Sequence, residues 1–232
     1  MIEIFAKRIE IEEDTQLMET KFEILSQQNR DKVERLRFRE DKIRTGLGEL
    51  LVRDVLKRKF DLDDEEIDYQ KDEYGKPFVG KMEDFYFNIS HSGHWVVCAL
   101  GGKPLGIDVE KIEKVDLNIA NKFFTKHEQD ALFRLPEEEQ LDYFFQIWTL
   151  KESFIKAQGK GLAIPLGSFT VVPDYRTKKI FFQSEDFNEK FYFRQFYLED
   201  NYKLAVCARE RHFSNELVIF EKLFHKGNNW LR

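Results

Sequence analysis

The chain has 232 residues, of which 42% are hydrophobic and 34% charged, and its formal net charge is −6 at pH 7. This apolar content suffices for one large domain or two small ones, and the net acidity argues against general nucleic-acid binding, which depends on clustered Lys and Arg. No apolar run approaches the roughly 18 residues of a membrane span, and the N-terminus lacks the apolar block of a signal peptide, so we expect a cytoplasmic protein with no membrane partner.

The first quarter of the chain predicts a strand followed by helices. Residues 1–16 alternate apolar and charged side chains, and residues 15–60 have a helical pattern. Within them, residues 29–60 carry apolar residues at the spacing of two amphipathic helices or one helix with a break. Lys and Arg are concentrated between Arg30 and Arg44, interleaved with acids. They are explained either by a solvated, ion-paired helix surface or by a basic binding surface that includes Lys32 and Arg44.

Residues 74–110 predict turns and strands. The Gly and Pro in residues 74–77 indicate a turn, and residues 85–110 predict three strands joined by two turns. The first of these turns holds Ser90, His91, Ser92 and Gly93, whose amides and hydroxyls can face an anion while His91 supplies a positive charge. An ordinary surface histidine is the alternative interpretation.

Asp108 and Glu110 are separated by one residue on the third predicted strand, so their carboxylates share one face. Two like charges on one face are tolerated if solvent screens them or if a divalent cation lies between them. A third carboxylate from Glu152 would make the cation more favourable, and oxygen ligands with water and phosphate suit Mg²⁺.

Residues 141–162 predict an amphipathic helix, with Asp142, Gln146, Thr149 and Ser153 on its polar side. Glu152 and Lys156 lie one turn apart, where a surface ion pair is the ordinary interpretation. Lys151 falls in the middle of the apolar side, where an ammonium is costly unless it meets an anion or reaches solvent.

Five motifs in order make the chain resemble the 4′-phosphopantetheinyl transferases of the monomeric type that activates surfactin synthetase. They are YGKP at 74–77, FNISHSG at 87–93, GIDVEKI at 106–112, FF at 123–124 followed by Glu128, and WTLKESFIKAQGKGL at 148–162. The resemblance implies a monomeric enzyme that moves the phosphopantetheine arm of coenzyme A to a serine of an apo carrier protein with Mg²⁺, releasing adenosine 3′,5′-bisphosphate. Its carriers belong to peptide, polyketide or fatty-acid synthases, as in nonribosomal peptide and antibiotic biosynthesis.

The resemblance also implies the roles of individual residues. Asp108, Glu110 and Glu152 resemble the metal ligands, Lys156 the phosphate-contacting lysine, and Glu152, directly or through a metal-bound water, the candidate base. The coenzyme A pocket is matched by Lys32, Arg44, Tyr74, Gly75, Lys76, Pro77, Ser90 and His91. One position departs from the pattern, because Asn29 stands where the relatives have a lysine ahead of Lys32; one phosphate contact is then missing unless Arg30 replaces it.

The family's fold implies an α+β protein of two similar α/β halves related by a pseudo-twofold, each a small antiparallel sheet packed with a long helix, with the active site between them. Residues 1–104 would form the half with the nucleotide pocket and residues 105–209 the half with the metal site, while residues 210–232 form a tail of unknown role. Residues 85–100 and 191–208 repeat the pattern of a hairpin that ends in Val-Cys-Ala or a similar run, although chance explains such a similarity equally simply. Cys98 and Cys207 lie in these apolar runs, where buried free thiols are expected and a disulfide stays open.

Two other function classes compete with the transferase. A Mg²⁺-dependent nuclease or phosphatase would also use paired carboxylates and a lysine, although the net acidity of the chain counts against a nuclease. A non-catalytic module that binds coenzyme A or a carrier protein would have no reason to keep three convergent carboxylates.

Overall fold

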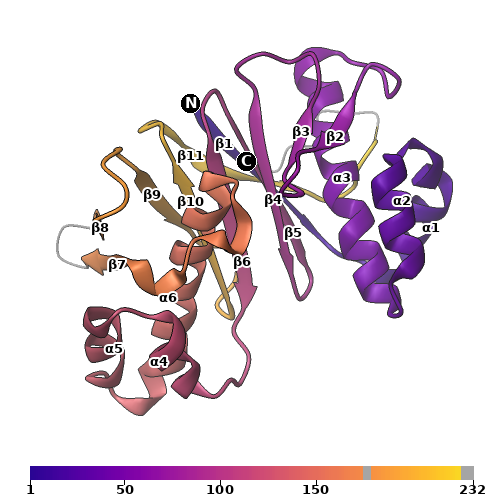
Figure 1. Ribbon diagram of the computed structural model, residues 1–232. Coiled ribbons are helices and arrows are strands. Elements are labelled where there is room, and N and C mark those ends of the chain that lie inside the picture. The colour runs from indigo at the N-terminus through magenta and orange to yellow at the C-terminus, as the bar shows by residue number, and fades with distance from the viewer. Residues whose placement is uncertain (175–178, 226–232) are drawn as a thin grey trace.

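The computed structural model describes residues 1–174 and 179–225, in which helices flank a central group of strands (Figure 1). The α-helices are α1 Ile11–Lys21, α2 Gln27–Arg35, α3 Arg39–Phe60, α4 Ala120–Phe123, α5 Lys126–Phe133 and α6 Glu137–Gln158. The strands are β1 Ile2–Arg8, β2 Tyr69–Lys71, β3 Pro77–Val79, β4 Tyr86–Ser92, β5 Trp95–Gly101, β6 Leu105–Lys111, β7 Phe169–Asp174, β8 Lys179–Ser184, β9 Tyr192–Phe196, β10 Tyr202–Ala208 and β11 Phe213–Phe220. Short 3₁₀ turns lie at Phe22–Ile24, Leu117–Ile119, Gly161–Ala163 and Leu166–Ser168.

The N-terminal half is a sheet in the order β11-β1-β5-β4 with α3 packed on one side. Leu47, Leu51 and Val55 of α3 are fully buried against Phe87 of β4 and Cys98 of β5. Residues 29–60, predicted as two amphipathic helices or one helix with a break, lie in α2 and α3, so the prediction of two helices is confirmed, and α1 precedes them. The breaks fall where Leu25 and Leu36 adopt extended backbone conformations, which an apolar spacing pattern does not reveal.

The C-terminal half repeats this arrangement with β6-β10-β9 and α6. In each half the first strand pairs with the last strand of a hairpin that follows the long helix, which gives β1-β5-β4 in one half and β6-β10-β9 in the other. The α+β prediction of two similar halves is therefore confirmed, as are the two predicted hairpins. Cys98 and Cys207 are buried free thiols in equivalent strands, and burial raises the pKa of both.

The sheet of the N-terminal half is completed by the end of the chain. Strand β11 lies within residues 210–232, whose role the sequence left open, and it runs parallel to β1 with Phe5 opposite Val218. The N-terminal sheet is consequently mixed, because its three other strands are antiparallel. Residues 226–232 lie outside the described residues.

The two halves meet where β4 and β6 pack side by side. Side chains of β4 take the place of a backbone ladder: Asn88 Oδ1, Ser90 Oγ and Ser92 Oγ accept hydrogen bonds from the backbone amides of Ile107, Val109 and Lys111, at 2.9, 3.3 and 3.1 Å. Because every second residue of a strand faces the same way, all three side chains point at β6. This seam fixes the register between the halves.

Helix α6 lies directly on β6 at Gly106. A Cβ at this position would approach the Ser153 carbonyl oxygen to 2.2 Å and the Ala157 amide nitrogen to 2.4 Å, so the contact requires glycine. The close approach brings the α6 side chains over the face of β6 that carries the two acidic residues.

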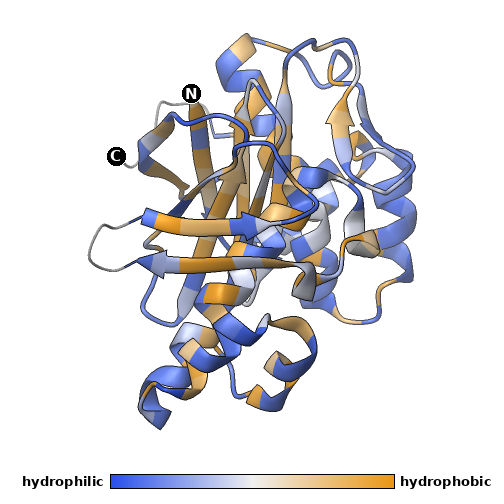
Figure 2. Ribbon diagram, turned by 60° about the vertical axis from the view of Figure 1, so that its left-hand side comes forward, coloured by the Kyte–Doolittle hydropathy of each residue, from blue (hydrophilic) through white to orange (hydrophobic). Residues whose placement is uncertain are grey.

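Apolar residues gather along the central strands, and polar residues gather on the loops and the outer surfaces of the helices (Figure 2). Among the described residues, no helix is long and apolar enough to cross a membrane.

Candidate active site

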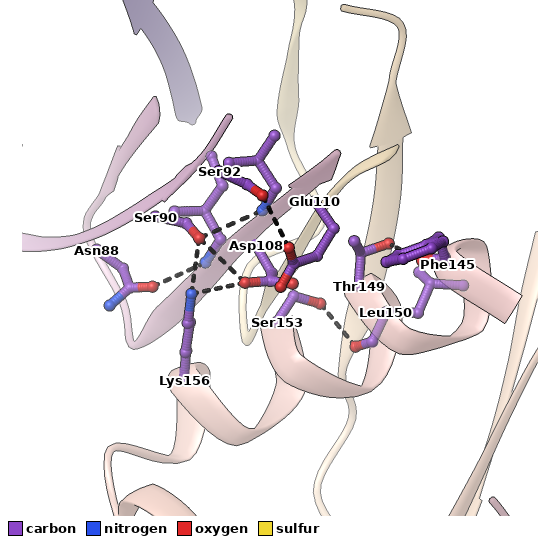
Figure 3. A network of polar contacts seen from close by, with 12 residues as sticks. Asn88, Ser90, Ser92, Asp108, Glu110, Phe145, Thr149, Leu150, Ser153 and Lys156 are labelled. Carbon is purple, nitrogen blue, oxygen red and sulfur yellow. Dashed lines mark hydrogen bonds and ion pairs between the residues drawn. The ribbon is translucent and has the colours of Figure 1, made fainter. Parts of the chain in front are cut away.

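Acidic, basic and hydroxyl side chains from three elements converge at the seam between the halves (Figure 3). Asp108 and Glu110 come from β6, Ser90 and Ser92 from β4, and Lys156 from α6. The two carboxylates share one face of β6, as the sequence predicted, while Leu105, Ile107 and Val109 are fully buried on the other face.

Asp108 lies at the centre of this cluster, with only 3% of its surface exposed. Its Oδ1 accepts hydrogen bonds from Lys156 Nζ at 2.7 Å and from Ser90 Oγ at 3.0 Å. Its Oδ2 is buried and has no hydrogen-bond partner among the described residues. Burial raises the pKa of Asp108, and Lys156 and Ser90 oppose this effect by stabilising the ionised form.

The two other carboxylates also titrate above their usual range. Burial, and then the charge of Asp108, raises the pKa of Glu110 to about 7, although Ser92 Oγ donates to Glu110 Oε2 at 2.9 Å. Burial, and then Asp108, likewise raises the pKa of Glu152. Asp108 thus raises the pKa values of both neighbouring carboxyls, and Glu152 also raises that of Glu110, so the site favours added positive charge.

Lys156 pairs with Asp108 of β6, and the surface pair between Glu152 and Lys156 is not formed among the described contacts. Lys156 Nζ also donates to Ser90 Oγ at 2.8 Å. The Lys156 ammonium thereby connects α6 to both β6 and β4. The four-residue spacing of Glu152 and Lys156 cannot reveal these contacts, because Asp108 and Ser90 belong to other sequence motifs.

The prediction that Thr149 and Ser153 lie on a polar, exposed side of α6 is wrong. Thr149 and Ser153 are fully buried because α6 packs closely on β6, and each satisfies its hydroxyl on its own helix, Thr149 with the Phe145 carbonyl and Ser153 with the Leu150 carbonyl. The charge predicted to be costly, Lys151, does meet an anion. Its fully buried Nζ lies 2.6 Å from Glu128 Oε1, which fastens α6 to α5.

The small-residue turn predicted at residues 90–93 is also wrong, because β4 continues through Ser92 and the turn consists of Gly93 and His94. Ser90 and Ser92 therefore face β6, whereas His91 points to the other side of the strand and is exposed. The pKa of His91 is lowered to about 4, first by desolvation and then by the cations Lys156, Lys32 and Arg44. Although the imidazole keeps access to solvent, it is neutral at pH 7 without a bound anion.

The sequence analysis did not predict that Asn88 and Ser92 support the site from β4. With Ser90 they occupy every second position of β4, and this period-two spacing of small polar residues was the available signal. Together with Ser90, they position β6, which carries Asp108 and Glu110, through side-chain hydrogen bonds to its backbone amides.

A cavity of about 310 Å³ lies beside the carboxylates. Its wall brings the turn formed by residues 74–77 together with Glu152 and Lys156, which are far away in sequence. A larger cavity of about 800 Å³ adjoins it and shares Tyr74, Lys76 and Pro77. The turn is formed as predicted, with Gly75 at φ 82°, and its Tyr74 is exposed.

Lys76 is held at the end of α6. Its Nζ donates to the backbone carbonyls of Lys156 at 2.7 Å and Leu105 at 3.1 Å, and burial lowers its pKa to about 8. The ammonium of Lys76 therefore joins the turn to the C-terminal half.

Lys32 and Arg44 lie on the N-terminal side of the site. Arg44 donates to the Gly93 carbonyl at 3.0 Å and pairs with Asp41 at 2.5 Å. Lys32 is exposed and, within residues 1–174 and 179–225, forms no hydrogen bond or ion pair. Both act electrostatically on His91, so the structure brings these three predicted cofactor-pocket residues together.

Comparison with known proteins identifies the family. A model described as the 4′-phosphopantetheinyl transferase superfamily matches residues 104–207, and one described as 4′-phosphopantetheinyl transferase, N-terminal, matches residues 13–103. The 4′-phosphopantetheinyl transferase Sfp of Bacillus subtilis (strain 168) is 41% identical over 201 residues, which cover 86% of this chain and 89% of that protein. This chain belongs to the 4′-phosphopantetheinyl transferase family.

Two further matches cover smaller parts of this chain. The 4′-phosphopantetheinyl transferase gsp of Aneurinibacillus migulanus is 40% identical over 169 residues, which cover 73% of this chain and 70% of that protein. Among solved structures, a holo-(acyl-carrier-protein) synthase from Bacillus anthracis str. Ames in complex with CoA matches with a TM-score of 0.41 and 18% identity, covering 45% of this chain and 93% of that chain.

Proposed function

We propose that this 4′-phosphopantetheinyl transferase moves the phosphopantetheine arm of coenzyme A to a serine hydroxyl of an apo carrier protein and releases adenosine 3′,5′-bisphosphate. One observation carries the proposal: Asp108, Glu110, Glu152 and Lys156 converge at the seam, beside a cavity walled by residues 74–77. These are the groups that the family resemblance assigns to the metal and to coenzyme A. Convergent carboxylates with a lysine also distinguish this proposal from that of a non-catalytic binding module.

The donor set fits Mg²⁺, which we propose as the cofactor. Three carboxylates supply hard oxygen donors, and the buried Asp108 Oδ2 has no hydrogen-bond partner among the described residues, so it is available to a cation. As the described side chains stand, no group of three His, Cys, Asp or Glu could hold a metal ion, so binding requires the carboxylates to turn towards one another. Bound by Asp108, Glu110 and Glu152, Mg²⁺ would neutralise charge on the coenzyme A diphosphate.

Lys156 would contribute charge stabilisation from the protein. In phosphoryl transfer the protein acts mainly by positioning and by stabilising charge. Lys156 Nζ is held on α6 between Ser90 and Asp108, and it lines the cavity together with Glu152. From that position it can pair with a diphosphate oxygen as negative charge moves towards the leaving group.

Glu152 would accept the proton of the carrier serine. It makes no hydrogen bond among the described residues, and burial and Asp108 raise its pKa, which makes its ionised carboxylate a better proton acceptor than an exposed one. The proton would pass from the serine Oγ to a Glu152 carboxylate oxygen while the serine oxygen attacks the β-phosphorus of coenzyme A. The bond between that phosphorus and the bridging oxygen of the diphosphate would break, and adenosine 3′,5′-bisphosphate would leave with the bridging oxygen.

We further propose that the enzyme acts as a cytoplasmic monomer. All of the groups named above belong to one chain, so the proposed site needs no residue from a second subunit. The carriers would be the apo domains of peptide, polyketide or fatty-acid synthases.

Mass spectrometry of an apo carrier protein incubated with coenzyme A, Mg²⁺ and this enzyme tests the proposal. The expected result is a mass gain of one phosphopantetheine arm on the carrier, lost when Mg²⁺ is chelated or when the carrier serine is replaced by alanine. No gain on several carriers of different synthase types would contradict the proposed function.

A further inference from the structure

Lys71 lies at the end of β2 with its ammonium against a neutral side chain of another element. Its Nζ donates to Asn29 Oδ1 of α2 at 2.6 Å, across 42 residues of sequence. The side chain is half-buried, and within residues 1–174 and 179–225 it forms no ion pair with a carboxylate. Because a partly desolvated ammonium without a counter-ion is unfavourable, binding an anion would stabilise the Lys71 charge.

The orientation of the Asn29 amide is fixed by a buried carboxylate. Asn29 Nδ2 donates to Glu49 Oε2 at 2.6 Å, and Glu49 also accepts from Ser26 and from Arg53. A carboxylate only accepts and an ammonium only donates, so the amide nitrogen must face Glu49 and the amide oxygen must face Lys71. Asn29 therefore positions the Lys71 ammonium through its amide oxygen.

Glu49 does not neutralise Lys71. The Glu49 carboxylate is fully buried and is paired with Arg53 at 2.8 Å. The pKa of Lys71 is lowered, first by desolvation and then by repulsion from Lys32, with Glu49 acting in the opposite direction. A bound dianion would relieve the repulsion between the Lys71 and Lys32 ammonium groups.

This pair of lysines is continuous with the candidate active site. Lys32 disfavours the charged forms of both Lys71 and His91, and Lys156 and Arg44 also disfavour the charged form of His91. Lys32 thus acts electrostatically both on Lys71 and on His91, next to the candidate active site where the coenzyme A diphosphate would bind. A terminal phosphate monoester, which carries close to two negative charges, is the part of coenzyme A that such a pair would recognise.

We propose that Lys71 binds the 3′-phosphate of coenzyme A together with Lys32, and so replaces the lysine that the family pattern places at position 29. The other replacement considered, Arg30, is engaged elsewhere: its guanidinium donates to the carbonyls of Glu23 and Leu25 at 2.7 and 3.1 Å. In this chain the positive charge would therefore come from Lys71 of β2 instead of from a lysine of α2. The shorter Asn29 side chain accepts a hydrogen bond from Lys71 and holds it in place. This inference rests on coenzyme A being the substrate.

Calorimetric titration of the full chain with coenzyme A and with dephospho-coenzyme A, without a carrier protein, tests the inference. Lys71→Gln removes the charge and keeps a donor for Asn29 Oδ1. It is expected to weaken coenzyme A binding about tenfold, which is about 1.4 kcal/mol, and to change dephospho-coenzyme A binding less than twofold. The matched control is Lys126→Gln on α5, which makes the same change of charge at a side chain that is 82% exposed, and it should alter neither dissociation constant.

A second variant tests the exchange of positions. Asn29→Lys combined with Lys71→Gln restores a lysine at the family position and is expected to recover the preference for coenzyme A over its dephospho form. Unchanged coenzyme A affinity in Lys71→Gln, or equal losses on both ligands, would overturn the inference. Wild-type protein that binds neither ligand would instead count against the proposed function, so the two failures are distinguishable.

Discussion

Replacing Glu110 with Gln should stabilise the metal-free fold at high pH while abolishing transfer. The pKa of Glu110 rises from its ordinary value of 4.5 to about 7, mainly by burial and by the neighbouring Asp108. The folded protein therefore binds this proton more tightly than the unfolded chain does. Stability contributed by the protonated form is present below pH 4.5 and is lost as the pH rises towards 7, so that ionised Glu110 destabilises the fold at pH 8.

The size of the effect follows from the two pKa values. One pKa unit corresponds to about 1.4 kcal/mol, which gives an upper limit of about 3 kcal/mol. Because Glu110 is only half-buried, solvent screening reduces the expected gain to about 1 to 2 kcal/mol. The Gln side chain keeps an oxygen that can accept the Ser92 hydroxyl, so no hydrogen bond is lost.

Thermal unfolding in chelator at several pH values measures this effect. Glu110→Gln should raise Tm by about 2 to 8 °C at pH 8, and the difference should shrink towards pH 5. Glu113→Gln is the matched control, because Glu113 is a neighbouring exposed glutamate that pairs with Lys111 on the surface; it should keep both Tm and transfer close to wild type. A Glu110→Gln protein that is less stable than wild type at pH 8, or whose Tm difference does not depend on pH, would refute the reasoning.

Three further substitutions test other parts of the molecule. Glu128→Gln leaves the buried Lys151 without its anion and should lower the free energy of unfolding by about 3 to 5 kcal/mol, measured by urea denaturation; a loss below about 1 kcal/mol would mean that Lys151 is neutral in the fold. Arg44→Ala should slow transfer from coenzyme A more than transfer from dephospho-coenzyme A, measured as kcat/KM, and equal losses would place Arg44 in the fold or at the diphosphate. Ile112→Asp, which changes a half-buried residue at the end of the acidic strand, should raise KM for the carrier and leave KM for coenzyme A unchanged; parallel changes would argue against a carrier surface there.

The sequence alone determined the features that depend on local spacing. Asp108 and Glu110 had to share a face because a strand alternates its side chains, and Lys151 had to find an anion because its helical position is apolar. The motifs also identified the family and the α+β fold of two similar halves. The spacing along a strand or helix determines which residues share a face, whereas the packing of the elements determines whether that face is buried.

Only the tertiary structure decided which residues meet across elements. The partner of Lys156 is Asp108 and not Glu152, and the support of Lys71 is Asn29, because these contacts depend on how α6 lies on β6 and how β2 lies beside α2. The burial of Thr149 and Ser153 likewise depends on Gly106, whose missing side chain admits the helix backbone. The addition of β11 to the N-terminal sheet joins the two ends of the chain. Residues distant in sequence meet only after the chain has packed, so no spacing rule along one element could have revealed these pairs.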